Sequence, residues 1–484
     1  MPDKLLTLKL HDNRFGNQAF QFIKKNNYWE TTVYRNGILV HSLSDKEMQL
    51  LLSLLRTYQN KSLIELQLLG LCSIGEGGVD KRNQEIVYLF TLRESDDCIR
   101  IDTYNMAGVV TLRDDQGYAV KLEISSRFDS SDKQFFLTYL LSKVADISFW
   151  SMTNSGQGSM GNILLAWAFI FLYRQAVKVG LYKQYHKIEY NNLHFKGKLD
   201  LDRHLKCNYP IFDKIAYSRR ENIFDNMINH LFRHAVEKIR TSYPEIYEAV
   251  SEDFFDLRVN TPTWEDSTKH VVLQRKETVS EIRHPYFAEF YEPLRKIARM
   301  FLNDEENDIY NTFEDDQVSG IIFDCSWLWE EYLARVLAPE FSHGDTSKPS
   351  TGAHHFSDGS GGLIFPDFYK LRNKNQKDRA SVILDAKYKM GKENENSADI
   401  AQIKLYIFTY GADLGGLIYP PLQIESDDML KEKIFNQHTV ETKKIFHSFA
   451  YARISDENYS DFEKFRNFMR TQEEKLKKFA NNIG

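Results

Sequence analysis

The chain has 484 residues, of which 42% are hydrophobic and 27% are charged, and its formal net charge is −6. This length is too great for a single ordinary core, and the composition excludes a largely disordered chain. Because the net charge is negative, any contact with nucleic-acid phosphates has to come from local basic clusters and not from the surface as a whole.

The four cysteines are scattered without a CxxC pair, and no signal peptide precedes the first charged residues. The longest apolar run, "ILLAWAFIFLY" at residues 163–173, is about half of the roughly 20 residues that span a bilayer. We therefore expect a cytoplasmic protein without membrane association, in which this run forms a buried helix.

Residues 1–150 alternate apolar and polar side chains in the manner of strands, for example in "KLLTLKL", "GVVTLR" and "YAVKLEIS". Asn36-Gly37, in the middle of "TTVYRNGILVHS", is a strong hairpin signal. Two segments with helical spacing, residues 46–56 and 133–144, interrupt the pattern. The sequence predicts a β-rich N-terminal domain.

Residues 151–310 are predicted to form a mainly helical middle region. A polar segment, "SMTNSGQGSMGN", is expected to be a linker, and "NIFDNMINHLFRHAVEKIR" is expected to be an amphipathic helix. Residues 156–161 match GxGxxG, but they lack a preceding buried strand and a following acidic residue, so we expect no dinucleotide there. No GxxxxGK[ST] occurs, and we expect this chain to bind no nucleotide itself.

Residues 311–484 alternate helix, strand, strand, helix and strand, which predicts an α/β domain. The whole chain is thus expected to be a multidomain α+β protein. Near its end, "EKFRNFMRTQEEKLKKFA" predicts a charged helix that faces solvent. His354 and His355 are a weak metal candidate, because adjacent histidines point in different directions on most backbones.

The stretch "IFPDFYKLRNKNQKDRASVILDAKYKM", residues 364–390, carries the strongest chemical signal. Its two apolar runs predict an antiparallel hairpin that brings Asp367 beside Asp385, with Lys387 on the same face as Asp385. Two close carboxylates resist joint ionisation unless a cation neutralises them, and Mg²⁺ selects such ligands together with water and phosphate oxygens. Lys387 can then contact the attacking water or the charge that builds on a phosphate.

The tripeptide [DE]xK is weak evidence by itself, since further copies occur at residues 441–443 and 473–475. The Asp385 copy differs because it closes an apolar run and follows a Pro-Asp at hairpin distance. The alternative is an ordinary salt-bridged pair at a strand end. The turn between the strands is either a solvated tip or a contact for the DNA backbone through its basic residues, Lys370, Arg372, Lys374, Lys377 and Arg379.

Two predicted helices flank this hairpin. "DCSWLWEEYLARVL" places Glu330 near its apolar side, and the helix that starts near Ser397 places Gln402 and Tyr406 one turn apart. Glu330 could supply a third carboxylate. Taken alone, a surface glutamate and a core tyrosine would be the favoured interpretations.

The series Glu330, Pro366-Asp367, Asp385-Ala386-Lys387 and Gln402-x-x-x-Tyr406 resembles the PD-(D/E)xK nuclease superfamily, in particular its RecB-like branch. "LWEEYL", "FPDFY", "ILDAKYK", "NLHFKGKLDLDRHL" and "ENIFDNMINHLFRHAV" are similar to McrC, the nuclease subunit of McrBC-type restriction systems that include the LlaJI-like ones. The likeness covers about residues 118–420, and the first 115 residues show none.

The resemblance implies an endonuclease subunit that cleaves double-stranded DNA with Mg²⁺, for which Mn²⁺ can substitute, through a PD-(D/E)xK nuclease-like domain at residues 311–484. Its partner would be an McrB-like AAA+ GTPase ring, which the N-terminal part engages and stimulates. The implied metal ligands are Asp367, Asp385 and Glu330, with Lys387 as the catalytic lysine and Gln402 and Tyr406 as site support or DNA contacts. Glu331 is the alternative to Glu330, which is preferred because an aromatic residue, Trp329, precedes it.

Two other functions remain open from the sequence. One is a non-catalytic regulator of the GTPase that keeps the nuclease fold for binding DNA. The other is a stand-alone RecB-like repair nuclease, which would need neither partner nor GTP.

Overall fold

The computed structural model describes residues 5–35, 37–61, 69–70, 88–116, 118–129, 134–145, 160–211, 213–303, 318–344, 352–354, 362–372, 380–389, 397–422, 430–434, 445–452 and 459–482. The chain divides into two compact units, one made of Met1–Leu164 with Phe313–Gly484 and the other of Leu165–Thr312. The predicted mixture of helices and strands is confirmed.

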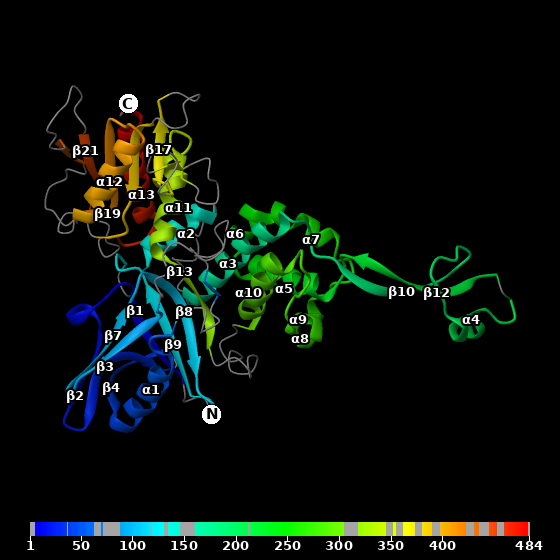
Figure 1. The fold of residues 1–484 in the computed structure, drawn as a ribbon. Helices are drawn as coiled ribbons and strands as arrows, with labels where there is room; N and C mark the ends of the chain where they lie inside the picture. Colours follow the sequence, from blue (N-terminus) through cyan, green and yellow to red (C-terminus); the bar gives the residue numbers. More distant parts are fainter. Residues whose placement is uncertain are drawn as a thin grey trace. The chain divides into compact units, whose positions relative to one another are not determined.

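The first unit contains a ten-stranded sheet with the order β5-β13-β8-β9-β1-β3-β2-β7-β6, in which β4 pairs with β3 (Figure 1). Its strands are β1 (Leu5–His11), β2 (Phe20–Lys25), β3 (Tyr28–Arg35), β4 (Ile38–Ser44), β5 (Leu69–Gly70), β6 (Phe90–Glu94), β7 (Cys98–Thr103), β8 (Met106–Arg113), β9 (Ala119–Ser125) and β13 (Val318–Asp324). The β3–β4 hairpin predicted at Asn36-Gly37 is confirmed by the pairing of Arg35 with Ile38, although Asn36 lies outside the described residues.

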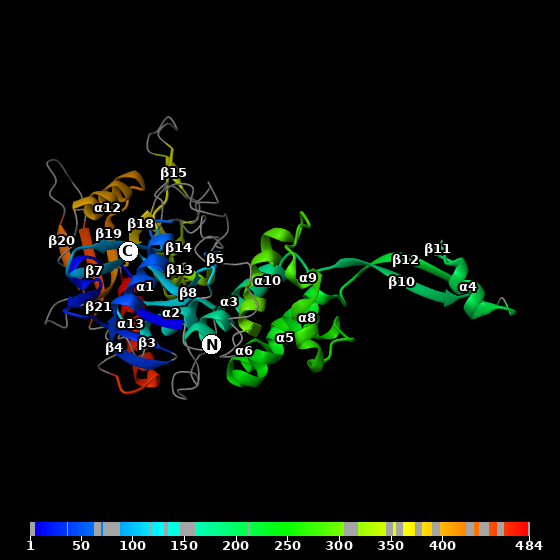
Figure 2. The same ribbon diagram turned by 90° about the horizontal axis from the view of Figure 1, so that it is seen from below.

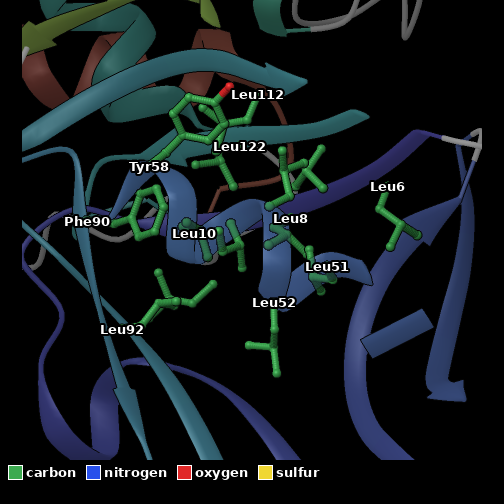
Figure 3. Packing of buried hydrophobic residues seen from close by; sticks show 14 of the residues in the cluster. Leu6, Leu8, Leu10, Leu51, Leu52, Tyr58, Phe90, Leu92, Leu112 and Leu122 are labelled. Carbon is green, nitrogen blue, oxygen red and sulfur yellow. The ribbon is translucent and has the colours of Figure 1, made fainter. Parts of the chain in front are cut away.

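Alternation along β1 explains how this sheet acquires a core. Leu6, Leu8 and Leu10 are buried on one face, while the residues between them are half-buried. Helix α1 (Asp45–Tyr58), which begins with a capping box between Ser44 and Glu47, packs its leucines against them. Figure 3 shows the two sets of leucines together with aromatic residues from β6 and α1. Burial of this apolar area is the main stabilising contribution here.

Strand β13 joins the ends of the chain into one unit. It pairs antiparallel with β8 along its full length, from Val318 with Leu112 to Asp324 with Met106. Gly320 permits the close approach, because a Cβ atom at this position would lie 2.3 Å from the carbonyl oxygen of Val109. The strand therefore belongs to the N-terminal sheet, and the helix that follows it starts from that sheet.

A second, six-stranded sheet lies in the C-terminal part of the same unit, with the order β14-β17-β18-β19-β21-β20. Its strands are β14 (Ser342–His343), β17 (Phe368–Leu371), β18 (Ala380–Ala386), β19 (Leu414–Leu422), β20 (Leu430–Ile434) and β21 (Ile445–Ala452), and a separate short pair is formed by β15 (Ala353–His354) and β16 (Leu363–Ile364). Helices α11 (Cys325–Leu337) and α12 (Ser397–Thr409) both contact β18. The predicted hairpin is confirmed as the antiparallel pair β17–β18.

The C-terminal helix α13 (Phe462–Asn482) corrects the prediction of a solvent-facing helix. One face carries apolar side chains that are buried, including Phe465, Met469 and Leu476. Glu473, which is 5% exposed, accepts hydrogen bonds from Tyr139 of α2 (Phe135–Ala145) at 2.6 Å and from Tyr332 of α11 at 3.1 Å. The sequence did not indicate this buried face, because the side chains buried on it include polar ones such as Glu473.

The second unit, Leu165–Thr312, is mainly helical. Its helices are α3 (Met160–Val177), which begins in the first unit, α4 (Leu201–Asn208), α5 (Met227–Ser242), α6 (Pro244–Val250), α7 (Phe255–Val259), α8 (Lys269–Gln274), α9 (Lys276–Val279) and α10 (Ala288–Asn303). The long apolar run is confirmed as a buried helix, since Leu164–Ile170 are all buried in α3. Within the described residues, none of the helices combines the length and the apolar character needed to cross a bilayer.

The sequence did not reveal a three-stranded sheet in this unit, with the order β10-β12-β11. β10 (Gln184–Asn192), β12 (Ile215–Ile223), β11 (Lys198–Leu199) and α4 form an arm, and Figures 1 and 2 show α4 at the end remote from the other helices of the unit. β12 also takes the first residues of the helix that was predicted from Asn222, and α5 begins only after Asn226, which caps it. Half-exposed strands such as β10 lack the apolar run that would mark them.

We predict that Glu473→Ala lowers the free energy of unfolding of the first unit by about 1–3 kcal/mol, because two buried tyrosine hydroxyls lose their acceptor. Urea denaturation of the full chain measures this. Glu474→Ala is the matched control, since Glu474 is exposed and should change stability by less than about 0.5 kcal/mol. Equal effects of the two substitutions would contradict the buried position of Glu473.

Candidate active site

Two aspartates lie at the ends of neighbouring strands. Phe368 of β17 pairs with Leu384 of β18, which places Asp367, directly before β17, opposite Asp385. The backbone N–H of Ala386 donates a hydrogen bond of 2.7 Å to Asp367 Oδ2 and fixes the first carboxylate at this strand end. Asp385 itself is only 1% exposed. The predicted meeting of the two carboxylates is therefore present in the structure.

Lys387 connects this strand end to helix α12. Its Nζ lies 2.5 Å from Asp385 Oδ2 and donates a hydrogen bond of 2.9 Å to Gln402 Oε1. Gln402 in turn donates a hydrogen bond of 2.9 Å to the hydroxyl of Tyr406, which is buried. The structure thus brings Asp385, Lys387, Gln402 and Tyr406 into one polar chain, whereas the helical spacing had predicted only that the last two lie one turn apart on one face.

Helix α12 is held in place by apolar packing on the face of β18 that also carries Asp385. Ile383, two residues before Asp385, belongs to the cluster that contains Ile403, Tyr406 and Ile407 of the helix. Gly415 of β19 allows this contact, because a Cβ atom there would lie 2.4 Å from the end of the Ile407 side chain. The packing that forms the core therefore also aims Gln402 at the lysine.

The electrostatics of the site follow from burial of like charges. Burial raises the pKa of Asp367 well above its ordinary value, and the charges of Asp385 and Glu330 raise it further. Burial also raises the pKa of Asp385, although Lys387 acts against this. Burial lowers the pKa of Lys387, but the charge of Asp385 outweighs it, so the pKa is raised and the lysine stays protonated. An additional cation would relieve the repulsion between the carboxylates.

Glu330 approaches the aspartates from α11. Its charge acts on both of them, and its Oε1 lies 2.7 Å from Nε2 of His343, whose ring stacks on Phe368. Glu331 lies half-buried on the same helix. Glu330 thus has a protein partner at the edge of the site.

Sequence reasoning missed several residues that shape the site. His343 pairs with Glu330, and Lys389 forms an ion pair with Asp399 in the first turn of α12. The backbone N–H of Gly344 donates a hydrogen bond of 2.9 Å to the carbonyl oxygen of Asp367. These contacts join separate elements, so no local periodicity could have indicated them.

The basic turn is described only at its first residues. Lys370 is half-buried on β17, and Arg372 forms an ion pair with Asp413. Lys374, Lys377 and Arg379 lie outside the described residues, as does His355. The predicted contact of this turn with DNA stays a prediction.

The donor set suits a small divalent cation with oxygen ligands. Asp385 Oδ2 is buried, and among the described residues its charged partner is the ammonium group of Lys387 at 2.5 Å. Over the same residues, no three side chains of His, Cys, Asp or Glu are grouped closely enough to hold a metal ion by themselves. Mg²⁺ commonly takes one or two protein carboxylates and completes its shell with water and phosphate oxygens, so Asp367 and Asp385 fit it.

Fold and site together define a mixed α/β protein in which two carboxylates and a lysine meet at the ends of adjacent strands. The chain belongs to the McrBC 5-methylcytosine restriction system component family, whose model matches residues 101–420. The resemblance to McrBC-type systems that the sequence suggested is thereby confirmed. The match includes the whole of the site described above.

Two solved structures are similar to the chain, both from Thermococcus gammatolerans. One is a refined half-complex from a tetradecameric assembly of McrB AAA+ hexamers with bound McrC, at 15% identity and a TM-score of 0.40, covering 78% of this chain and 85% of the other. The other is the McrBC complex, at 14% identity and a TM-score of 0.28, covering 69% of this chain and 88% of the other. No curated protein matches the chain.

We predict that Gly344→Ala destabilises the first unit by about 1–3 kcal/mol, as overpacking does elsewhere. The added Cβ would lie 2.1 Å from the carbonyl oxygen of Pro366, and backbone atoms cannot yield cheaply. Urea denaturation measures the effect, with Glu340→Ala at a nearby exposed position as the control. Unchanged stability of the Gly344 variant would contradict the close approach of Gly344 to the backbone of Pro366.

Proposed function

We propose that this protein is the McrC-like nuclease subunit of a GTP-dependent McrBC-type restriction system, and that it hydrolyses phosphodiester bonds of double-stranded DNA. The observation that carries the proposal is the arrangement of Asp367, Asp385 and Lys387 at adjacent strand ends, with Lys387 held by Asp385 and Gln402. Membership of the McrBC component family supports the restriction context.

The site residues have distinct roles in this proposal. Asp367 and Asp385 would hold Mg²⁺, for which Mn²⁺ can substitute, with Glu330 as a further or orienting carboxylate. When bound, the metal lowers the pKa of water and screens the charge of the scissile phosphate. Lys387, protonated and fixed by two partners, supplies positive charge where negative charge develops on the phosphate. Gln402 and Tyr406 keep the ammonium group in this direction.

The proposed partner is an McrB-like AAA+ GTPase whose GTP hydrolysis this chain stimulates. A surface suited to a protein partner lies on the arm, where the segment between β10 and β12 exposes large apolar side chains, namely Leu193, Phe195, Leu201, Leu205, Tyr209 and Ile211. Contiguous patches of exposed apolar side chains mark interaction surfaces, whereas scattered single side chains do not. The family resemblance implies that the N-terminal part of the chain makes this contact, and the arm is a second candidate surface.

A cleavage assay with the purified chain, Mg²⁺ and double-stranded DNA, with and without the GTPase and GTP, separates the possible functions. Cleavage that needs the GTPase and GTP supports the proposal. Cleavage by the chain alone would indicate a stand-alone repair nuclease. Stimulated GTP hydrolysis without any cleavage would indicate a regulator that only binds DNA.

We predict that Asp385→Asn and Lys387→Met each lower the cleavage rate by at least about 100-fold, because each removes a charge that acts on the reacting phosphate or its metal. Binding to the GTPase should be unchanged. Lys475→Met is the matched control, since Lys475 closes another [DE]xK tripeptide but is exposed on α13. Full cleavage by either site variant would refute the assignment.

Divalent cations should stabilise the first unit in the absence of DNA. At a Mg²⁺ concentration 100 times its dissociation constant, mass action adds about 2.7 kcal/mol to the stability of the folded state. We predict a rise in the thermal unfolding midpoint for the wild type and for the control Asp413→Asn, and none for Asp385→Asn. Asp413 is exposed on the same part of the chain and forms an ion pair with Arg372 of the turn. A metal response that survives in Asp385→Asn would place the cation elsewhere.

A further inference from the structure

Tyr388, the residue that follows Lys387, is anchored in the N-terminal sheet. Its side chain is buried, with 6% exposure, and its hydroxyl lies 2.7 Å from Oγ of Ser126. Ser126 directly follows β9, and the two residues are separated by 262 positions in the sequence. This hydrogen bond therefore ties the end of the site strand to a distant part of the first unit.

The ring of Tyr388 also contacts residues that follow β9. The guanidinium of Arg127 lies 4.8 Å from the ring centroid, and Phe128 meets the ring edge-on at 5.0 Å. Arg127 is itself fixed by Asp12, which is fully buried and accepts hydrogen bonds of 2.5 Å from its backbone N–H and of 2.7 Å from Nη2. Removing one partner of a buried ion pair is costly. The pair therefore keeps Arg127 in place beside the ring of Tyr388.

Asp12 and Arg127 follow two strands that pair with each other. Asp12 follows β1 and Arg127 follows β9 by two residues, and the two strands run parallel in register from Leu5 with Ala119 to His11 with Ser125. The backbone N–H of Asp12 continues this pairing with a hydrogen bond of 2.8 Å to the carbonyl oxygen of Ser125. The support under Tyr388 is thus an extension of the N-terminal sheet.

Three consecutive residues after β18 consequently contact two separate parts of the unit, because Lys387 and Lys389 reach α12 while Tyr388 reaches the N-terminal sheet. Lys387 faces Asp385 and Gln402, Tyr388 contacts Ser126 and Arg127, and Lys389 pairs with Asp399. The backbone of Lys387 is also bonded to β19 through the carbonyl oxygen of Ile418, at 2.9 Å. The lysine is therefore placed between two anchored neighbours.

We propose that Tyr388 and Ser126 are positioning residues, through which the N-terminal sheet fixes the direction of the Lys387 ammonium group. The proposal rests on the function proposed above, since it assigns that direction a catalytic purpose. Reacting groups have to be held within roughly 0.5 Å of their productive geometry, and a displacement of about 1 Å can cost about 100-fold in rate. A change in the N-terminal sheet would then alter the site without touching any residue in it.

Tyr388→Phe tests this with the smallest possible change, because the ring and its contacts stay while the hydroxyl is removed. Ser126→Ala removes the other partner, and the double variant shows whether the two act through the same bond. Tyr58→Phe is the matched control: Tyr58 is 3% exposed in the N-terminal core, and its hydroxyl donates a hydrogen bond of 2.8 Å to the carbonyl oxygen of Arg113.

The first measurement does not require cleavage. Competitive acetylation of the full chain without metal, DNA or partner, read by mass spectrometry, reports how well Lys387 is protected by Asp385 and Gln402. We expect at least about threefold faster acetylation of Lys387 in Tyr388→Phe, and no change in Tyr58→Phe. Unchanged protection in Tyr388→Phe, or the same loss in the control, would overturn the proposal.

The second measurement is cleavage with the GTPase and GTP present. Tyr388→Phe should lower kcat about tenfold with KM for DNA unchanged, and adding Ser126→Ala should lower it little further, because the two residues share one bond. A drop in kcat that follows only the loss of thermal stability, equally in Tyr58→Phe, would contradict a positioning role. If the wild type itself does not cleave DNA, the proposed function fails, while the acetylation result still decides whether Tyr388 positions Lys387.

Discussion

The site depends on the burial of Asp385 beside Lys387 at the end of a strand. Removing two charges from water is costly, and their attraction offsets this cost only where further hydrogen bonds complete the arrangement. Here Lys387 is paired with Asp385 and donates a hydrogen bond to Gln402, which in turn donates one to the hydroxyl of Tyr406. This pairing requires helix α12 to lie against β18. The polar contacts of the site therefore depend on the apolar packing between this helix and the second sheet.

A second constraint comes from the N-terminal sheet. Strand β13 completes that sheet and leads directly into α11, which carries Glu330, while the ends of β1 and β9 hold Tyr388. Both connections join segments that are more than a hundred residues apart in the sequence, and the residues of the second unit lie between these segments in the chain. The first unit is therefore assembled from both ends of the chain, and the groups around the site are set by strands that carry none of the proposed metal ligands.

The sequence indicated the local parts of this arrangement and not the distant ones. The two-residue period of "SVILDAKY" placed Asp385 and Lys387 on one face, and the one-turn spacing of Gln402 and Tyr406 placed both on one face of their helix. In contrast, the local pattern of a segment does not indicate which distant segment it will contact. Three contacts were missed for this reason: the pairing of β13 with β8, the contact of Tyr388 with Ser126 and the bond of His343 to Glu330. Glu473 was missed because a charged residue within a charged helix gives no sign that its neighbours will bury it.

The central claim is that Asp367 and Asp385 together bind a divalent cation next to Lys387. A crystal structure of the full chain soaked with Mn²⁺, with anomalous scattering collected at the manganese edge, tests this most directly. The account predicts an anomalous peak in contact with carboxylate oxygens of both aspartates. A well-occupied Mn²⁺ site elsewhere with no peak at these aspartates, or a peak bound by Glu330 and His343 alone, would contradict it.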